Sequence, residues 1–91
     1  MNLHHLEFVV GVAEQGGFRR AAASMHISQS ALSRAIATIE ARVGAPLFHR
    51  TSQGVTLTAI GETYVAAARE VLEAHRALER AVGGATHRLA G

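Results

Sequence analysis

The stretch FRRAAASMHISQSALSRAIATIEARVG, residues 18–44, decides the fold. It opens with an alanine-rich segment, residues 18–25, whose small side chains favour a helix that another helix can approach closely. A break follows, and Ser28 is a good N-cap for a second helix. Gly44 and then Pro46 form a typical stop signal. Two short helices joined by a tight turn predict a helix-turn-helix.

The second helix has one apolar and one polar face. Its apolar residues recur at spacings of three and four: Leu32, Ala35, Ile36, Ile39 and Val43. Polar side chains occupy the other face: Ser28, Gln29, Ser30, Ser33, Arg34 and Thr38. The second helix of this motif lies in the major groove of DNA, where Gln pairs with adenine, Arg with guanine and Ser with several base edges or a phosphate. The segment therefore predicts sequence-specific binding to double-stranded DNA.

The flanking segments complete a larger unit. Apolar residues at helical spacing predict a first helix over residues 3–15. Two short strands, residues 47–50 and 55–57, surround a polar turn that contains glycine, and this pattern predicts a hairpin. The order of elements is that of a winged helix-turn-helix, a mainly α fold with three helices and a two-stranded wing.

A long helix is expected over residues 59–82, capped by Thr58 and ended by Gly83 and Gly84. The chain is then expected to divide into three parts: a winged helix-turn-helix DNA-binding domain over residues 1–58, a linker or dimerisation helix over 59–83 and a flexible tail over 84–91.

The long helix carries an apolar seam with alternating spacings of four and three, which is typical of paired helices. After Leu57 and Gly61, the residues expected to dimerise are Tyr64, Ala68, Val71, His75, Leu78 and Val82. A second stripe, Ile60 and Ala67 with Val65 and Leu72 as further candidates, is expected to dock on the helix's own domain. The chain is too short to bury both faces, so the seam predicts a homodimer that suits an inverted-repeat site. The alternative is that the seam docks wholly within one chain.

Charge is unevenly distributed along the 91 residues, whose formal net charge is +2. Residues 16–56 carry five arginines against Glu40 alone, whereas arginine and glutamate balance from residue 57 onward. This distribution suggests a phosphate-facing part beside a protein-facing part. The sequence contains no lysine, and arginine favours forked contacts to phosphate or guanine.

Other function classes receive little support. The chain contains no cysteine and no aspartate, so neither a metal site nor a cofactor is expected, and we expect no enzymatic activity. A winged helix used for protein contact would show a neutral or apolar exposed face on residues 29–43. An architectural DNA-binding protein without sequence specificity would carry more basic residues.

Several motifs together resemble the N-terminal domain of LysR-type transcriptional regulators. They are FRRAA (residues 18–22), SQSALSR (28–34), GAPLFHRT (44–51) and VTLTAIGE (55–62), and the match extends in register over about residues 1–83. The resemblance implies that Gln29, Ser30, Ser33 and Arg34 read bases or grip the backbone. It also implies that Arg50 on the wing reaches the minor groove, that Thr51 contacts phosphate, and that the long helix pairs antiparallel with its twin.

The sequence also departs from the family pattern. Gln53 stands where the family usually carries arginine, so the wing tip should hold DNA less strongly, and Ala37 replaces a common basic residue. Gly17 replaces the usual serine cap, a small loss. Family members usually continue into a ligand-sensing domain, so a tetramer and a small-molecule inducer are expected only for a longer form. With no signal-peptide or membrane-spanning pattern, we expect a bacterial cytoplasmic location at the nucleoid.

Overall fold

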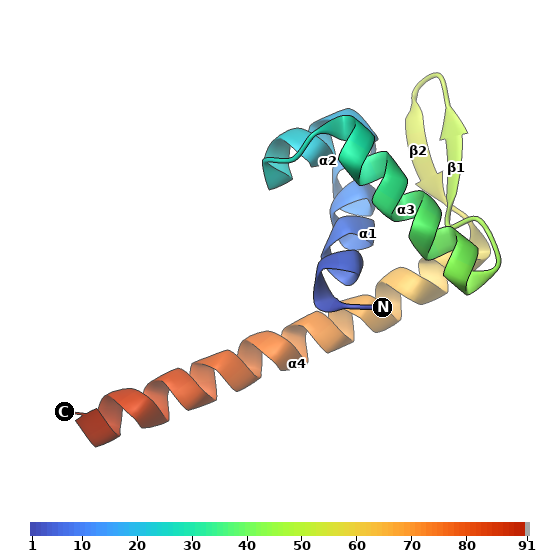
Figure 1. Cartoon of the computed structure of the whole chain (residues 1–91). Helices are drawn as coiled ribbons and strands as arrows, with labels where there is room; N and C mark the ends of the chain where they lie inside the picture. The colour runs from blue at the N-terminus through green and yellow to red at the C-terminus, as the bar shows by residue number, and fades with distance from the viewer. Residues whose placement is uncertain (91) are drawn as a thin grey trace.

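The computed structural model describes residues 1–90. Its elements follow one another in the order α1 (Leu3–Gln15), α2 (Phe18–Met25), α3 (Gln29–Val43), β1 (Phe48–Thr51), β2 (Gly54–Leu57) and α4 (Ala59–Ala90). The first three helices and the hairpin form a head, and α4 leaves it as a long arm that ends at the C-terminus (Figure 1). The molecule therefore extends over 54 × 25 × 19 Å. This arrangement confirms the predicted mainly α, winged helix-turn-helix fold.

Side-chain caps fix where three of the helices begin. Asn2 accepts a hydrogen bond from the backbone N–H of His5 at the start of α1. The Ser28 hydroxyl accepts one from Ala31 N–H at 3.1 Å, and Thr58 accepts one from Gly61 N–H at 2.9 Å. Such caps satisfy backbone donors that the first helical turn leaves unpaired. The predicted capping roles of Ser28 and Thr58 are confirmed.

The core joins all the helices of the head. Its largest fully buried side chains come from α1, α3 and the segment before β1: Val9, Val12, Leu32, Ile36, Ile39 and Leu47. Glu40, the lone acidic residue of the basic segment, accepts a hydrogen bond from Leu47 N–H at 2.7 Å. This contact ties α3 to the chain that enters the wing, so Glu40 has a structural role.

The wing differs from its prediction by one residue at each strand. The strands pair antiparallel with Phe48 opposite Leu57 and Thr51 opposite Gly54, which leaves a turn of two residues. Leu47, expected in the first strand, instead lies in the core before it. The Thr51 hydroxyl donates to the Gly54 carbonyl at 3.2 Å and accepts from Gln53 N–H at 3.2 Å. These bonds extend the pairing into the segment expected to be turn.

Helix α4 continues past its predicted end, through Gly83 and Gly84 to Ala90. The expected helix end at these glycines is wrong, and residues 84–90, expected as a tail, are helical; Gly91 lies outside the described residues. Glycine lowers helix propensity by about 1 kcal/mol relative to alanine but keeps its backbone N–H donor, so the hydrogen-bond ladder can pass through it. Proline would have ended the helix.

One stripe of α4 packs on the head, where Val65, Ala68 and Leu72 are buried. The stripe begins at Gly61, where the helix approaches the head so closely that a Cβ would collide with the Leu47 carbonyl. Two assignments made from the sequence are therefore wrong. Ala68 lies in the core of its own chain instead of on a dimer seam, and the predicted docking residues Ile60 and Ala67 are exposed.

Both stripes of α4 satisfy the same spacing of three and four. At 100° per residue, the exposed apolar stripe lies roughly 100° around the helix from the docked stripe. The exposed stripe consists of Ile60, Ala67, Val71, Leu78 and Val82. Tyr64 lies between the two, half buried, and its hydroxyl donates to Met1 Sδ at 3.0 Å. Partial burial raises the pKa of the Tyr64 hydroxyl above its usual value.

Candidate nucleic-acid interface

The polar face of α3 lies on the outside of the head. Leu32, Ile36 and Ile39 are completely buried on the opposite face, and this anchoring turns the polar residues outward. Each side chain predicted to contact DNA from this helix or its cap is exposed, except for the half-buried Ser33: Ser28, Gln29, Ser30, Arg34 and Thr38. The structure therefore gathers the predicted residues of this helix on one surface.

These side chains differ in how free they are. The hydroxyls of Ser28 and Thr38 have partners, because Ser28 caps α3 and Thr38 donates to the Arg34 carbonyl at 3.0 Å. Within residues 1–90, no hydrogen bond or ion pair engages the side chains of Gln29, Ser33 and Arg34. Gln29 and Arg34 can thus present an amide and a guanidinium, the two groups that make bidentate contacts to bases.

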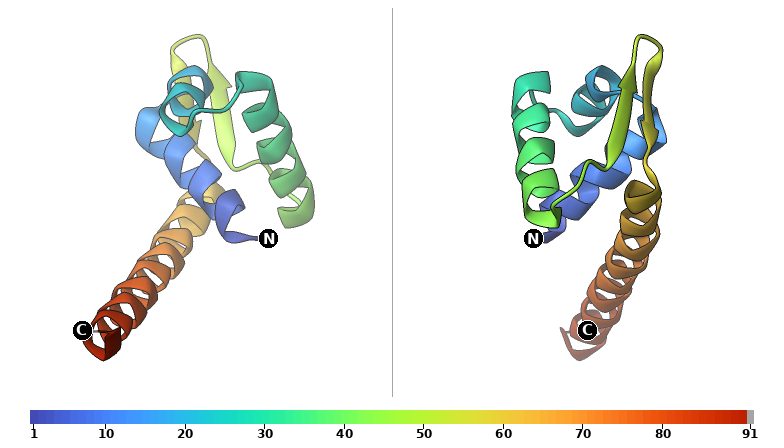
Figure 2. Two further views of the ribbon diagram at one scale, coloured as in Figure 1. Left: turned by 60° about the vertical axis from the view of Figure 1, so that its left-hand side comes forward. Right: turned by 90° about the vertical axis from the view of Figure 1, so that its right-hand side faces the viewer.

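The start of α3 and the tip of the wing lie at the same end of the head (Figure 2). Between them runs a groove of about 580 Å³. Gln29 lines it from α3, Thr51–Gly54 line it from the wing, and Gly16–Arg20 line it from the turn and first residues of α2. Three segments, the last of them more than twenty residues along the sequence from the other two, are thereby joined into one concave surface.

The arginines of α2, α3 and the wing have different partners, and two of them, Arg19 and Arg20, line the groove. Arg20 is engaged by the fold, since its Nε and a terminal nitrogen donate to the Gln15 carbonyl at 3.1 and 2.7 Å. Arg50 lies on β1 with its guanidinium carbon 4.2 Å from the centre of the Phe18 ring. Arg19 and Arg34 are exposed, and in the described part of the chain no carboxylate pairs with them. The groove lining therefore contains two arginines and, in the described part of the chain, no carboxylate.

Ion pairs gather on other surfaces instead. Arg69 on α4 pairs with Glu14 on α1, and His4 Nδ1 lies 3.3 Å from Glu7 Oε1 within α1. Farther along α4, His75 lies 3.4 Å from Glu79, and Glu73 contacts both Arg76 and Arg80. Hydrogen bonds from Arg80 and Arg76 lower the pKa of the Glu73 carboxyl. The acidic residues thus balance α1 and α4 and leave the α3 and wing surface basic, as the charge pattern predicted.

The wing residues have mixed roles. Arg50 and Gln53 are exposed, and Gln53 lies at the tip. The hydroxyl of Thr51, expected to contact phosphate, is hydrogen-bonded within the turn. Three features escaped sequence reasoning: the Phe18–Arg50 stack, the Arg20 cap on α1 and the position of Arg19 beside the groove. No spacing rule connects residues 18 and 50, because the contact exists only after the wing folds against α2.

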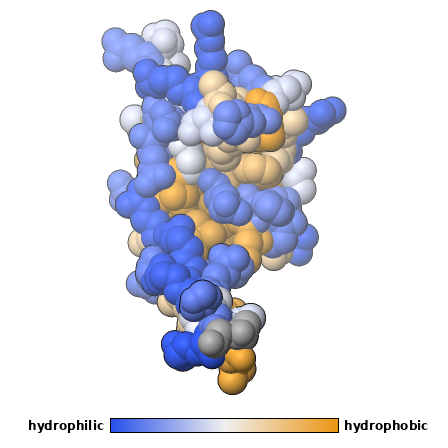
Figure 3. All heavy atoms as spheres, turned by 90° about the vertical axis from the view of Figure 1, so that its left-hand side faces the viewer, coloured by the Kyte–Doolittle hydropathy of each residue, from blue (hydrophilic) through white to orange (hydrophobic). Residues whose placement is uncertain are grey.

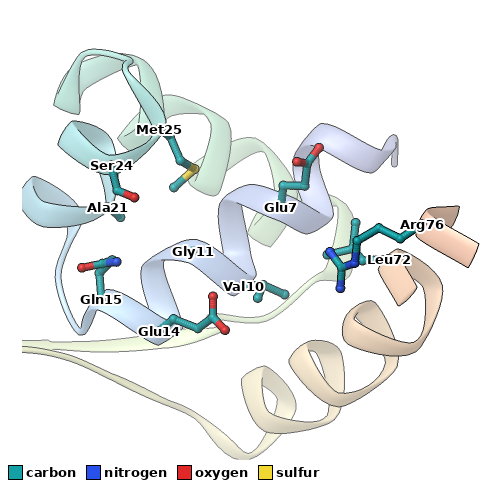
Figure 4. Close-up of a pocket in the computed structure, with 10 residues that line it drawn as sticks. All are labelled: Glu7, Val10, Gly11, Glu14, Gln15, Ala21, Ser24, Met25, Leu72 and Arg76. Atoms are coloured by element: carbon teal, nitrogen blue, oxygen red, sulfur yellow. The ribbon is translucent and has the colours of Figure 1, made fainter. Parts of the chain in front are cut away.

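A second cavity, of about 250 Å³, lies between α1, α2 and α4 (Figure 4). Glu7 and Glu14 border it from α1, Met25 from α2, and Leu72 and Arg76 from α4. In residues 1–90, no group of three His, Cys, Asp or Glu side chains is arranged to hold a metal ion. None of the helices in this range is both long and apolar enough to span a membrane.

Comparison with known proteins agrees with this architecture. The sequence model of a family described as "Bacterial regulatory helix-turn-helix protein, lysR family" matches residues 3–62. The HTH-type transcriptional regulator TfdT of Cupriavidus pinatubonensis is 49% identical over 72 residues, which cover 79% of this chain and 32% of TfdT. The DNA-binding transcriptional dual regulator OxyR of Escherichia coli is 43% identical over 79 residues, covering 87% of this chain and 26% of OxyR.

Two solved DNA-binding domains have the same shape. A CbnR_DBD–DNA complex superposes with a TM-score of 0.83 at 35% identity and covers 93% of this chain and 99% of that one. A BenM_DBD/catB site 1 DNA complex gives a TM-score of 0.84 at 31% identity, covering 100% and 99%. The chain thus spans a whole domain of these structures but about a third or less of TfdT and OxyR. With the fold, the motifs and the sequence match in agreement, this chain belongs to the lysR family of bacterial regulatory helix-turn-helix proteins.

Proposed function

We propose that this chain binds double-stranded DNA sequence-specifically and acts as the DNA-binding part of a transcriptional regulator. The main observation is that the unpaired side chains of Gln29 and Arg34 are exposed on α3 and that Gln29 also lines the groove that the wing tip completes. The CbnR and BenM domains of the same shape were crystallised with DNA, which supports the proposal. A bacterial cytoplasmic location at the nucleoid follows from it.

In this proposal α3 enters the major groove, where Gln29, Ser33 and Arg34 contact base edges and Ser30 contacts a base or a phosphate. Ser28 and Thr38 act chiefly through their bonds to the helix and add backbone contacts to DNA at most. The wing lies against the minor groove with Arg50, Thr51 and Gln53. Arg19 adds a phosphate contact, because it is exposed, cationic and borders the same groove.

We further propose that two chains pair antiparallel through α4. The exposed apolar stripe supports this, with 47% of Val71, 60% of Leu78 and 55% of Val82 accessible. Tyr64 and His75, which are half buried, border this stripe; Ala68 does not belong to it. Pairing would cover these residues and set two α3 helices toward the half-sites of an inverted repeat. A tetramer and a small-molecule inducer belong to a longer form with an effector domain.

The test begins with duplexes selected by the wild-type protein from a random library, together with candidate promoter fragments. Fluorescence anisotropy at one fixed salt concentration compares the selected duplex with a scrambled one. Arg34→Ala and Gln29→Ala should each weaken binding to the selected duplex by about 1–3 kcal/mol, the range typical of a base contact. They should affect the scrambled duplex much less.

Arg88→Ala is the matched control, because Arg88 lies in the last turns of α4, away from α3. It removes the same charge and should leave the affinity for the selected duplex unchanged. Equal affinity of the wild type for both duplexes, or no effect of Arg34→Ala, would reject sequence-specific recognition by α3.

A further inference from the structure

Phe18, the first residue of α2, contacts the wing from below. Its side chain is 93% buried, yet one face of its ring is covered by the guanidinium of Arg50, 4.2 Å from the ring centre. Phe48 meets the same ring edge-on, with 6.0 Å between centroids and 72° between planes. Phe18 is therefore held by one aromatic neighbour and itself supports a cation that belongs to another element.

A backbone hydrogen bond also holds the wing close to the Phe18–Arg50 contact. Val55, the residue opposite Arg50 in the hairpin, donates its N–H to the Gly16 carbonyl at 3.1 Å. Gly54 permits this approach, since a Cβ there would collide with the Gly16 oxygen. The turn between α1 and α2 thus binds β2 through the Gly16 carbonyl, and Phe18 at the start of α2 supports the side chain of Arg50 on β1.

We propose that Phe18 is a positioning residue that holds the Arg50 guanidinium ready to contact DNA. The proposal rests on the DNA-binding function proposed above. An arginine side chain loses rotamer entropy when a ligand immobilises it, and a contact already made in the free protein reduces that loss. The Phe18 ring covers one face of the guanidinium. The N–H donors of a guanidinium lie in its own plane, so contact with the ring face leaves them available to other partners.

The charge environment agrees with this role. In residues 1–90 no carboxylate pairs with Arg50, and its side chain is exposed although the ring beneath it is buried. At an exposed site a ring face stabilises a cation about as much as an acidic partner does, but only the ring face leaves the positive charge unneutralised. Arg50 is instead restrained without being neutralised, which suits a group that has to bind an anionic backbone.

The first test is a double-mutant cycle on affinity for the selected duplex. Phe18→Leu retains an apolar side chain but removes the ring face, and it should weaken binding about two- to five-fold, the equivalent of an exposed cation–π contact. Phe18→Tyr keeps the ring and should restore binding. The variant Phe18→Leu with Arg50→Met should bind no more weakly than Arg50→Met alone, because Phe18 acts through Arg50.

Phe8→Leu serves as the matched control, since Phe8 is a partly buried core ring without Arg50 over it. It loses the same atoms and should leave DNA affinity unchanged. Thermal unfolding of every variant shows which proteins are folded at the assay temperature. Additive losses in the cycle, or equal losses from Phe8→Leu and Phe18→Leu, would mean that Phe18 matters only for the core.

A second measurement needs no DNA. In NMR spectra of the free protein, the Nε–Hε resonance of Arg50 should be shifted upfield by the Phe18 ring. Relaxation measurements should show that the Arg50 side chain is less mobile than the Arg88 side chain. Phe18→Leu should make the two alike. If Arg50 is as mobile as Arg88 in the wild type, the proposal is overturned. If Arg50 is ordered but the wild type fails to discriminate between duplexes, the proposed function fails instead, so the two outcomes are distinguishable.

Discussion

At the scale of single residues, neighbours of the same type have different roles. Arg19 and Arg20 are adjacent and both exposed, yet only Arg20 donates two hydrogen bonds to the Gln15 carbonyl at the end of α1. The amino-acid composition cannot distinguish these two arginines, because each contributes one positive charge. The difference arises from direction, because successive side chains on α2 point about 100° apart.

We therefore predict opposite effects for two adjacent alanine substitutions. Arg20→Ala should lower the free energy of unfolding by about 0.5–1.5 kcal/mol, since the carbonyls at the C-terminal end of α1 lose their cation. Arg19→Ala should change the free energy of unfolding by less than about 0.5 kcal/mol but reduce DNA affinity and lower the slope of log K against log salt by about one. Urea unfolding and anisotropy titrations at several salt concentrations measure these effects. A larger loss of unfolding free energy for Arg19→Ala than for Arg20→Ala would contradict the assignment.

At the scale of elements, α4 has two apolar stripes and two halves. Its first half packs on the head through Val65 and Leu72, whereas its last turns pass through Gly83 and Gly84 with open space beside Gly83. Exposed ion pairs such as Glu73 with Arg80 add little to its stability. The second half is therefore the part of the helix in which intrinsic propensity decides helicity.

Two glycine-to-alanine substitutions distinguish the part of the chain stabilised by packing from the part stabilised by helix propensity. Gly83→Ala should increase helix content at the end of α4, by about 1 kcal/mol in local helix stability, because a Cβ there meets no other atom. Gly54→Ala should instead destabilise the head by about 1–3 kcal/mol, since φ at this residue is 129° and its Cβ would collide with the Gly16 carbonyl. Circular dichroism at 222 nm follows the first effect and urea unfolding the second. A stabilising Gly54→Ala would refute the described wing geometry.

At the scale of the molecule, α4 leaves a stripe of apolar side chains exposed to water. Figure 3 shows apolar side chains gathered between polar ones on the side where α4 ends. The stripe itself contains Ile60, Val71, Leu78 and Val82, each about half accessible. Water-exposed apolar residues in a continuous row favour association, because pairing removes them from water.

A charge placed in the stripe should prevent pairing. Val71→Glu should shift the protein from dimer to monomer in sedimentation equilibrium at micromolar concentration, because pairing would bury a carboxylate without a partner. Ala66→Glu is the control, since residue 66 is exposed and lies on the side of α4 away from both stripes. It should remain dimeric. A monomeric wild type would exclude dimerisation through α4 at that concentration.

Most of the fold could be predicted from the sequence by itself. Caps such as Ser28 and stops such as Gly44 act within one turn of helix, so the bounds of α1, α2 and α3 follow from local chemistry. The buried face of α3 likewise follows from its spacing, and that face fixes which side of the helix is polar. The exposed positions of Gln29 and Arg34 were therefore predictable, whereas their contacts with bases remain a prediction.

The tertiary structure decided what spacing leaves ambiguous. Residues 57, 61, 64 and 68 repeat as regularly as residues 60, 67, 71 and 78, so only packing against the head reveals that Ala68 is buried and Ile60 is exposed. The stack of Arg50 on Phe18 and the engagement of Arg20 by Gln15 also required the folded chain. Periodicity specifies which residues share a face, but the partner of that face depends on contacts between distant segments.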